Sequence, residues 1–559
     1  MHSSSESPSK STTVALLLVA ATLWLLLHGY HGLTGDGQIY AFQALAKIRP
    51  NLATDLYLQN TSQDQFTIFS GLYAWFIQWL GIEPAARLLT LLLSFWLLAA
   101  AWSAARAVAG RDAAWLAVAF LLIVDGGYGA SGVFRISEQF LTARLPAEAL
   151  VVTALACFLN GWKMLGTAIA AAALFVHPLI ALPGVLLLIS LWVSIRAGVA
   201  GAIAGISAVL AIAAAAACFP SVALVFPLMD PAWLDIVQER SQFLFLPLWS
   251  FRDWDLNTRP FLSLAFTAIA VSDHRIRKLC VAAALVGAAG LAVALISSLI
   301  GPVALLVQGQ AWRWVWIPAF VSALLLPAVV LGIWKDGKCG LLCAVLLVSG
   351  WTLSAVNGTA CVSIAIVVWV MRANIGARLA TYLRWASVAL GAAIAAWILF
   401  QSYGIVTSAF RASDRTAGVA QGIFGLRISA ALFAILAWWC ARFSRSTWVP
   451  VSLSAMLLVL SISVLPAAFK QTRTLGAAAD IADSSDWRDA IPPTSTVLVA
   501  PPTDVGAFVW FTLQRPNYLA LDQSAGAVFS RATAMEIARR SDVLLPVTDP
   551  DWKILTHLH

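Results

Sequence analysis

The stretch VALLLVAATLWLLL, residues 14–27, is followed shortly by GDGQIY, residues 35–40. The first stretch carries no charge and, with its neighbours, reaches the length of about 20 residues that a helix needs to cross a membrane. The second places the carboxylate of Asp36 where this apolar span ends. Because a charge near the hydrocarbon is costly unless it is used, Asp36 is a candidate functional residue. The alternative is a turn or helix-capping aspartate, since Asp-Gly is a common turn sequence.

Composition places the whole chain in a membrane. Of its 559 residues, 60% are hydrophobic and only 11% are charged, whereas soluble domains carry about 25% charged residues. The net charge of +8 comes with basic residues clustered between apolar runs, such as Arg275–Lys278 and Lys335–Lys338. Cytoplasmic loops look like this under the positive-inside rule, so the charge indicates topology and not a nucleic-acid partner. We expect an all-α polytopic membrane protein.

The apolar runs predict about 13–15 transmembrane helices, some of the short runs being re-entrant or merged. The predicted spans are 13–32, 84–106, 113–129, 147–161, 164–180, 181–195, 198–218, 260–271, 279–300, 313–333, 339–356, 359–371, 385–403, 426–441 and 448–468.

The same reading divides the chain into three parts. A cytoplasmic N-terminus puts the basic clusters on the inner side of the membrane. Residues 1–12 are then a cytoplasmic tail, 13–468 the membrane domain and 469–559 a domain outside the membrane. The longer polar segments, first among them the loop 33–83, also fall outside.

The outer segments carry helical patterns of their own. Residues 38–48 and 66–80 have apolar residues at helical spacing, which predicts two amphipathic helices lying along the membrane interface. Residues 231–249, rich in aromatic side chains, are a candidate for a third.

The C-terminal part changes character. Residues 480–490 and 531–540 have helical patterns, whereas Thr496–Ala500, bounded by prolines, and Tyr518–Leu521 predict short strands. We therefore expect a small α/β domain on the outer face.

The order of features at the front of the chain resembles a known family. Asp36 and the two interfacial helices are followed by LGIEPAARLL, residues 80–89, which opens the second span, and by ARAVAGRDAA, residues 105–114, before the third. This arrangement, over roughly residues 13–180, is similar to the GT-C superfamily of polytopic membrane glycosyltransferases, which use polyprenyl-phosphate-linked sugars. The resemblance implies a GT-C-like membrane fold in which the acid after the first span is the catalytic base, or in some branches a metal ligand.

The match at this acid is not complete. Many members carry two adjacent acids there, whereas Asp36 stands alone between Gly35 and Gly37. This departure disfavours a metal-bound mechanism, although the resemblance leaves a divalent metal open as a cofactor.

A second acid lies in FRISEQFLTARLP, residues 134–146, on the same predicted face as Asp36. GT-C enzymes often place a further acid in this loop, so the resemblance makes Glu138 a second catalytic candidate. The neighbouring Arg135 and Arg144 could bind a phosphate. The alternative is an ordinary loop ion pair between Glu138 and one of these arginines.

A third candidate segment is QGQAWRWVW, residues 308–316. The guanidinium of Arg313 could clamp the phosphate of a polyprenyl-phosphate donor at the headgroup level and stabilise it as it leaves. Trp312 could stack on a sugar ring, and Gln308 and Gln310 could bind its hydroxyls. The alternative is an anchoring belt of Trp and Arg at the membrane interface.

Two residues complete the candidate site. His177 closes a span toward the outside and either touches the donor phosphate or is structural. Asp55, in the first loop, either binds the acceptor or caps a helix. Motifs of P-loop proteins, HExxH metalloproteases and GxSxG hydrolases are absent from the sequence.

We therefore predict a glycosyltransferase of the bacterial inner (plasma) membrane. It moves a sugar from a polyprenyl-phosphate donor to a glycan, lipid or protein acceptor on the outer face, with inversion and with Asp36 as the general base. Its partners are these substrates and the membrane lipids. The alternatives are a transporter or flippase of lipid-linked glycans, and a non-catalytic scaffold in envelope assembly. A transporter usually places ionisable residues at mid-membrane, and the predicted span interiors are nearly free of charge.

Overall fold

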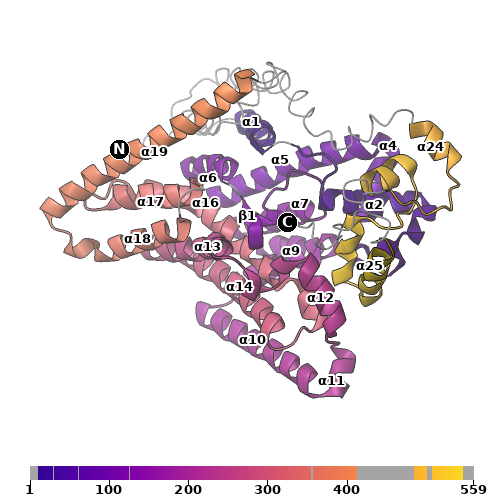
Figure 1. Ribbon diagram of the computed structural model, residues 1–559. Coiled ribbons are helices and arrows are strands. Elements are labelled where there is room, and N and C mark those ends of the chain that lie inside the picture. The colour runs from indigo at the N-terminus through magenta and orange to yellow at the C-terminus, as the bar shows by residue number, and fades with distance from the viewer. Residues whose placement is uncertain are drawn as a thin grey trace.

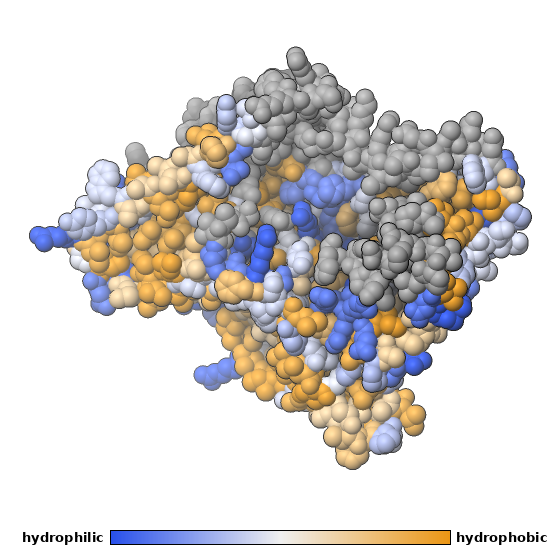
Figure 2. Space-filling view, in the orientation of Figure 1, coloured by the Kyte–Doolittle hydropathy of each residue, from blue (hydrophilic) through white to orange (hydrophobic). Residues whose placement is uncertain are grey.

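The computed structural model describes residues 10–28, 30–60, 62–124, 126–353, 357–411, 484–499 and 506–544. These residues are almost entirely helical (Figure 1). The predicted spans 426–441 and 448–468 lie outside the described residues. On the face shown in Figure 2, hydrophobic residues cover the flanks and hydrophilic residues gather in a recess near the middle.

A helix is present at each of the thirteen predicted spans that fall within the described residues, which confirms the all-α class. These helices are α1 (Lys10–His28), α5 (Ile82–Ala109), α6 (Arg111–Ile123), α7 (Arg144–Leu159), α8 (Lys163–Val176), α9 (Pro178–Trp192), α10 (Ile195–Cys218), α13 (Phe251–Ala270), α14 (His274–Leu299), α16 (Trp316–Ile333), α17 (Gly340–Thr352), α18 (Gly358–Val370) and α19 (Ala377–Arg411).

Five helical segments of the described chain are long and apolar enough to cross a membrane. They are Ile82–Ala109, Ile195–Cys218, His274–Leu299, Ala304–Ile333 and Ala377–Gln401. The fourth joins the short helix α15 (Ala304–Gly309), a 3-10 turn at Ala311–Val315 and α16. The chain therefore has the properties of an integral membrane protein, and the larger number of spans stays a prediction.

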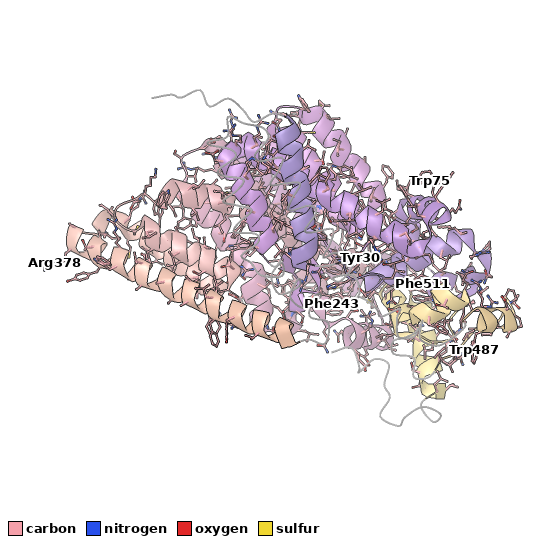
Figure 3. All side chains as sticks on the ribbon, turned by 90° about the horizontal axis from the view of Figure 1, so that it is seen from above. Tyr30, Trp75, Phe243, Arg378, Trp487 and Phe511 are labelled. Carbon is pink, nitrogen blue, oxygen red and sulfur yellow. The ribbon has the colours of Figure 1, made fainter. Side chains whose placement is uncertain are left out.

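The first loop contains the two expected helices, α2 (Asp36–Ile48) and α4 (Phe69–Leu80), with the short α3 (Leu56–Gln59) between them. α2 and α4 pack against each other through Tyr40 and Phe69, whose rings meet edge to face. The other face of α4 exposes Trp75 and Trp79, and Trp75 lies at the periphery of the molecule (Figure 3). An exposed tryptophan face is what a helix at a membrane interface requires.

A short β-hairpin, not predicted from the sequence, follows α6. Its strands are β1 (Gly127–Tyr128) and β2 (Phe134–Arg135), and Tyr128 pairs with Phe134. Successive side chains of a strand point to opposite faces. Phe134 is accordingly buried and Arg135 is exposed.

The described C-terminal residues are mostly helical, so the predicted α/β domain is not confirmed. α24 (Ser484–Ala490) and α25 (Arg531–Leu544) occupy the two predicted helical regions, with a π-helical turn at Phe508–Leu513 and a 3-10 helix at Leu521–Val528 between them. Of the two predicted strands, only a single parallel bridge between Val497 and Asn517 forms within the described part. We call residues 484–499 and 506–544 the C-terminal unit.

The C-terminal unit packs against the loop helices. α25 contacts α12 (Pro231–Arg240), and the 3-10 helix Leu521–Val528 contacts α12, α25, α2 and α3 (Figure 1). Trp233 of α12 donates its indole N–H to the carbonyl of Ala527. The first loop, α12 and the C-terminal unit therefore pack against one another.

Candidate functional site

Asp36 lies at the start of α2, where three segments distant in sequence meet. Its Oδ2 accepts a hydrogen bond from Nη1 of Arg144 at 2.7 Å. The Asp36 side chain keeps 36% of its surface exposed, whereas that of Arg144 keeps only 3%. Oδ1 of Asp36 has no hydrogen-bond partner among the described residues. The carboxylate is therefore anchored on one side and open on the other.

Glu138 holds the same arginine from the opposite side. Its Oε1 accepts from Nε of Arg144 at 2.7 Å, and its Oε2 accepts from the hydroxyl of Thr142. The Glu138 side chain is 4% exposed, and both of its oxygens are engaged. Of the two roles open to it, Glu138 thus takes that of an ion-pair partner that positions Arg144.

A second guanidinium, that of Arg313, lies close to the same group. Its carbon Cζ is 4.0 Å from the centre of the Phe134 ring, and Cζ of Arg144 is 4.5 Å from that centre. Such contacts between a guanidinium and an aromatic ring are attractive. Phe134 therefore brings together two positive charges that would otherwise repel each other.

The turn that carries Arg313 is fixed by close packing. Gln310 adopts a left-handed conformation at φ 44°, and its Oε1 accepts from Nε of Arg313 at 2.8 Å. Gly290 of α14 lets the turn approach closely, since a Cβ there would lie 2.4 Å from the carbonyl oxygen of Ala311. The terminal nitrogens Nη1 and Nη2 of Arg313 have no acceptor among the described residues. They are the donors available to a ligand.

A third arginine, Arg240 at the end of α12, completes the group. Its Nε donates to the hydroxyl of Ser524 in the C-terminal unit at 2.6 Å. Its charge, like that of Arg313, acts on Asp36. We call Arg144, Arg240 and Arg313 the arginine group. The charges of three guanidiniums thus act on the one half-open carboxylate.

The electrostatics follow from this arrangement. Burial opposes ionisation of Asp36, but the charge and hydrogen bond of Arg144, together with Arg313 and Arg240, outweigh it and hold the pKa of Asp36 below its usual value. For Glu138 the balance is reversed, because burial raises its pKa more than Arg144 and Thr142 lower it. Burial also raises the pKa of Tyr40 on α2 to about 12. Asp36 is therefore ionised at neutral pH.

Two residues of the 308–316 segment have structural partners. The side-chain nitrogen of Gln308 donates to the backbone carbonyls of Val528 and Phe529 at 3.2 and 3.3 Å. Trp312 is 1% exposed, and a Cβ on Gly129 would lie 2.3 Å from its ring. The structure thus gives Trp312 a packing role beneath the hairpin and leaves it no exposed face for a sugar.

Asp55 caps α3 and is fully buried. One oxygen accepts from the backbone N–H of Tyr57 and from Nε2 of Gln523, and the other from Nε1 of Trp510 and the N–H of Asn517. Burial raises its pKa against these four bonds. Asp55 thus joins the first loop to the C-terminal unit, which agrees with the capping alternative for this residue.

Of the two remaining predicted residues, His177 lies near the site and Arg135 lies away from it. His177 is the N-cap of α9, with Nδ1 accepting from the N–H of Ile180 at 3.3 Å, and it is within electrostatic range of Arg313 and Arg144. Arg135 points to the opposite side of the hairpin and lines a different cavity. The predicted phosphate-binding arginines are therefore divided between two places.

Sequence reasoning missed Arg240, Phe134 and Glu148. Glu148, in the first turns of α7, is completely buried, and its Oε2 accepts from the N–H of Ser137 at 2.9 Å. Its Oε1 has no partner in the described part of the chain. An acidic residue inside an apolar helix is a candidate functional residue by its position alone. On that ground the sequence could have indicated Glu148.

The carboxylates do not suit a divalent metal in this arrangement. Asp36 and Glu138 are the two acids of the site, and the guanidinium of Arg144 occupies the place between them. Across the described residues, there is no group of three or more His, Cys, Asp or Glu side chains that could hold a metal ion.

Comparison of the chain with protein-family models, with curated proteins and with solved structures finds no match. Function therefore has to be argued from the site itself.

Proposed function

We propose that the chain is a membrane glycosyltransferase that moves a sugar from a polyprenyl-phosphate donor to an acceptor hydroxyl. One observation carries the proposal: a half-open carboxylate, Asp36, is paired with the buried Arg144 and feels the charges of Arg313 and Arg240, at the end of a bundle of apolar helices. A lipid-linked phosphate reaches this end of a bundle while its chain stays in the membrane.

The arginine group supplies the phosphate site. If Asp36 and Glu138 are ionised, the three arginines leave one excess positive charge, which matches the single negative charge of a sugar–phosphate–lipid diester. The free terminal nitrogens of Arg313 suit phosphate oxygens, since a guanidinium binds them through paired hydrogen bonds. As the sugar–phosphate bond breaks, the electron pair goes to the phosphate, where these cations stabilise it.

Asp36 supplies the base. Its open Oδ1 accepts the proton of the acceptor hydroxyl, whose oxygen attacks the anomeric carbon from the face opposite the phosphate. A low pKa keeps the carboxylate ionised but makes it a weak base. When the donor phosphate binds, its negative charge offsets part of the effect of Arg144 on Asp36. The pKa of Asp36 then rises, and its carboxylate becomes a stronger base.

The test is Asp36→Asn. Membranes containing the chain are incubated with a panel of radiolabelled polyprenyl-phosphate hexoses and pentoses, and transfer is followed as release of polyprenyl phosphate. We expect the variant to lose at least about 100-fold in rate, as loss of a general base typically does, while its binding of the donor lipid stays.

A matched control is Asp64→Asn, in the same loop, where the carboxylate pairs with the half-exposed Lys47 at 2.6 Å. This change should leave transfer near its original rate. Transfer that survives Asp36→Asn refutes the role of Asp36 as the base. Absence of transfer by the unchanged chain with every donor of the panel refutes the enzyme proposal and favours a transporter or a scaffold.

A further inference from the structure

A second polar cavity lies on the other side of the β-hairpin from Asp36. Its volume is about 350 Å³, and it is walled by β2, the start of α13 and the end of α17. None of the residues that line it belongs to the arginine group or to the Asp36–Glu138 pair. A volume of this size falls in the range of small-molecule sites.

Three arginines line this cavity: Arg135 from β2, and Arg252 and Arg259 from α13. The last two are seven residues apart, so they lie on one face of the helix about 10 Å apart along its axis. Arg252 is exposed and makes no hydrogen bond or ion pair with the described residues.

The two aspartates of the cavity bind backbone groups and add two negative charges to its lining. Asp253 accepts from the N–H of Ser131 and from the N–H and hydroxyl of Ser250, which completes the cap of α13. Asp255 accepts from the N–H groups of Gly358 and Thr359 at the start of α18. Both carboxylates thus accept from backbone donors, and the three arginines of the lining exceed them by one positive charge.

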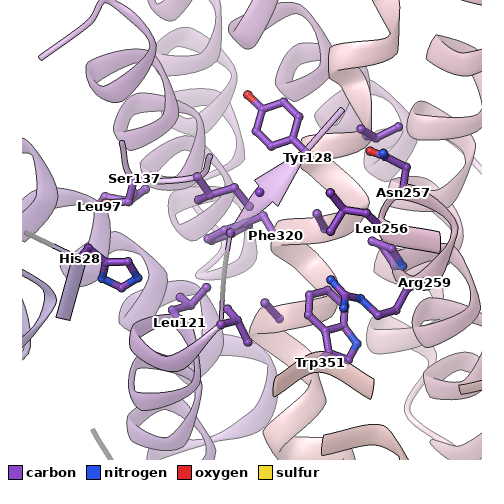
Figure 4. A pocket seen from close by; sticks show the side chains of 18 of the residues that line it. His28, Leu97, Leu121, Tyr128, Ser137, Leu256, Asn257, Arg259, Phe320 and Trp351 are labelled. Carbon is purple, nitrogen blue, oxygen red and sulfur yellow. The ribbon is translucent and has the colours of Figure 1, made fainter. Parts of the chain in front are cut away.

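The far wall of the cavity is aromatic. Cζ of Arg259 lies 4.6 Å from the centre of the Trp351 ring, and Nη1 of Arg259 donates to the carbonyl of Gly350 at 2.9 Å. Arg259, Trp351 and Leu256 also border a smaller pocket of about 40 Å³ (Figure 4). Because that pocket has room for little more than one water molecule, a ligand has to occupy the larger cavity.

We propose that this cavity is a binding site for a phosphate group carried by a small polar headgroup. Cations that arrive from two elements and are spread along a helix suit a tetrahedral anion, whose oxygens point in several directions. A planar carboxylate would be satisfied by one guanidinium fork. If the proposed glycosyl transfer holds, this ligand is the acceptor, which is then a phosphate-bearing molecule bound across the hairpin from the donor.

The experiment measures binding of radiolabelled glycerol 3-phosphate to the full-length chain in phosphatidylcholine nanodiscs. Arg252→Gln should weaken binding about tenfold, which corresponds to about 1.4 kcal/mol, and Arg252→Lys should weaken it less because it keeps the charge. The matched control is Arg275→Gln, an exposed arginine at the start of α14 outside the cavity, and it should bind as the unchanged chain does.

Two competitors then identify the source of the phosphate. Displacement of the label by phosphatidate in the nanodisc at lower concentration than by inorganic phosphate indicates a lipid headgroup, and equal displacement indicates a free phosphate. The proposal is overturned if neither competes, if Arg252→Gln binds normally, or if Arg275→Gln binds as weakly. Asp36→Asn should retain this binding, so failure of the transfer proposal and failure of this one give different results.

Discussion

Arg144 is the residue on which the candidate site depends, and Arg144→Gln tests that dependence. In the unchanged chain, one guanidinium serves both Asp36 and Glu138 at 2.7 Å. Glutamine keeps some hydrogen-bonding capacity but removes the charge. Two carboxylates then remain in a buried place without their shared cation.

The size of the effect follows from burial. Removing one partner of a buried ion pair costs about 3–5 kcal/mol. The side chain of Glu138 is 4% exposed, whereas that of Asp36 is 36% exposed, so water partly screens the ion pair between Asp36 and Arg144. We therefore expect a loss near the lower end of that range, about 3 kcal/mol at pH 8.

The loss should depend on pH in a definite direction. The low pKa of Asp36 stabilises the folded chain above the ordinary carboxyl pKa, and this contribution disappears with Arg144. The pKa of Glu138 is already raised and rises further, so stability falls as pH increases through the interval between its unfolded and folded values. Each pH unit over which Glu138 must stay protonated costs about 1.4 kcal/mol. The deficit is smallest at low pH.

The assay compares thermal unfolding midpoints of the purified variant and the unchanged chain in detergent at pH 5 and pH 8. The difference should be clearly larger at pH 8. As a control, Arg87→Gln removes an ion pair with Glu83 whose partners are 43% and 32% exposed, for which about 0–1 kcal/mol is expected. A deficit for Arg144→Gln that is equal at both pH values, or larger at pH 5, would refute this account of the site.

Two further outcomes follow from the contacts of the C-terminal unit. Asp55→Ala leaves the buried N–H of Trp510 and other donors unpaired, which costs about 1–3 kcal/mol for each donor. Limited proteolysis should therefore release the C-terminal unit at least about tenfold faster than in the unchanged chain. Cleavage at the unchanged rate would contradict the role given to Asp55. Arg240→Gln should weaken binding of the polyprenyl-phosphate donor about tenfold with an unchanged unfolding midpoint, and unchanged donor affinity in a binding assay would remove Arg240 from the phosphate site.

The helices could be predicted because apolar runs and helical spacing leave the backbone few alternatives. The spans from α5 to α18 and the loop helices α2 and α4 all appear close to their expected positions. The prediction of two strands in the C-terminal part is not confirmed, for a different reason. A strand needs a partner, and within the described residues the β-branched run around Val497 bridges only to Asn517, while Phe508–Leu513 forms a π-helical turn.

The candidate site was predictable where charge stood out against an apolar background. Asp36 stands out at the end of an apolar span and the resemblance to GT-C enzymes indicates Glu138, with Arg144 beside it and Arg313 in a Trp-rich segment; the structure brings all four together. Arg240 could not be found in this way, because it lies in the segment 231–249, whose pattern predicts an interfacial helix but does not indicate which element an arginine at the end of PAWLDIVQER contacts. Only the packing of α12 against the C-terminal unit turns it toward Asp36.

The four hydrogen bonds of Asp55 have a consequence for how the protein is made. Three of them come from Trp510, Asn517 and Gln523, which a ribosome adds more than four hundred residues after the aspartate. Until then Asp55 of the growing chain lacks those three donors, and the first loop cannot form its contacts with the C-terminal unit. Assembly of this end of the molecule is therefore among the last events of its biogenesis, and a product that ends before residue 510 would leave Asp55 without these three donors.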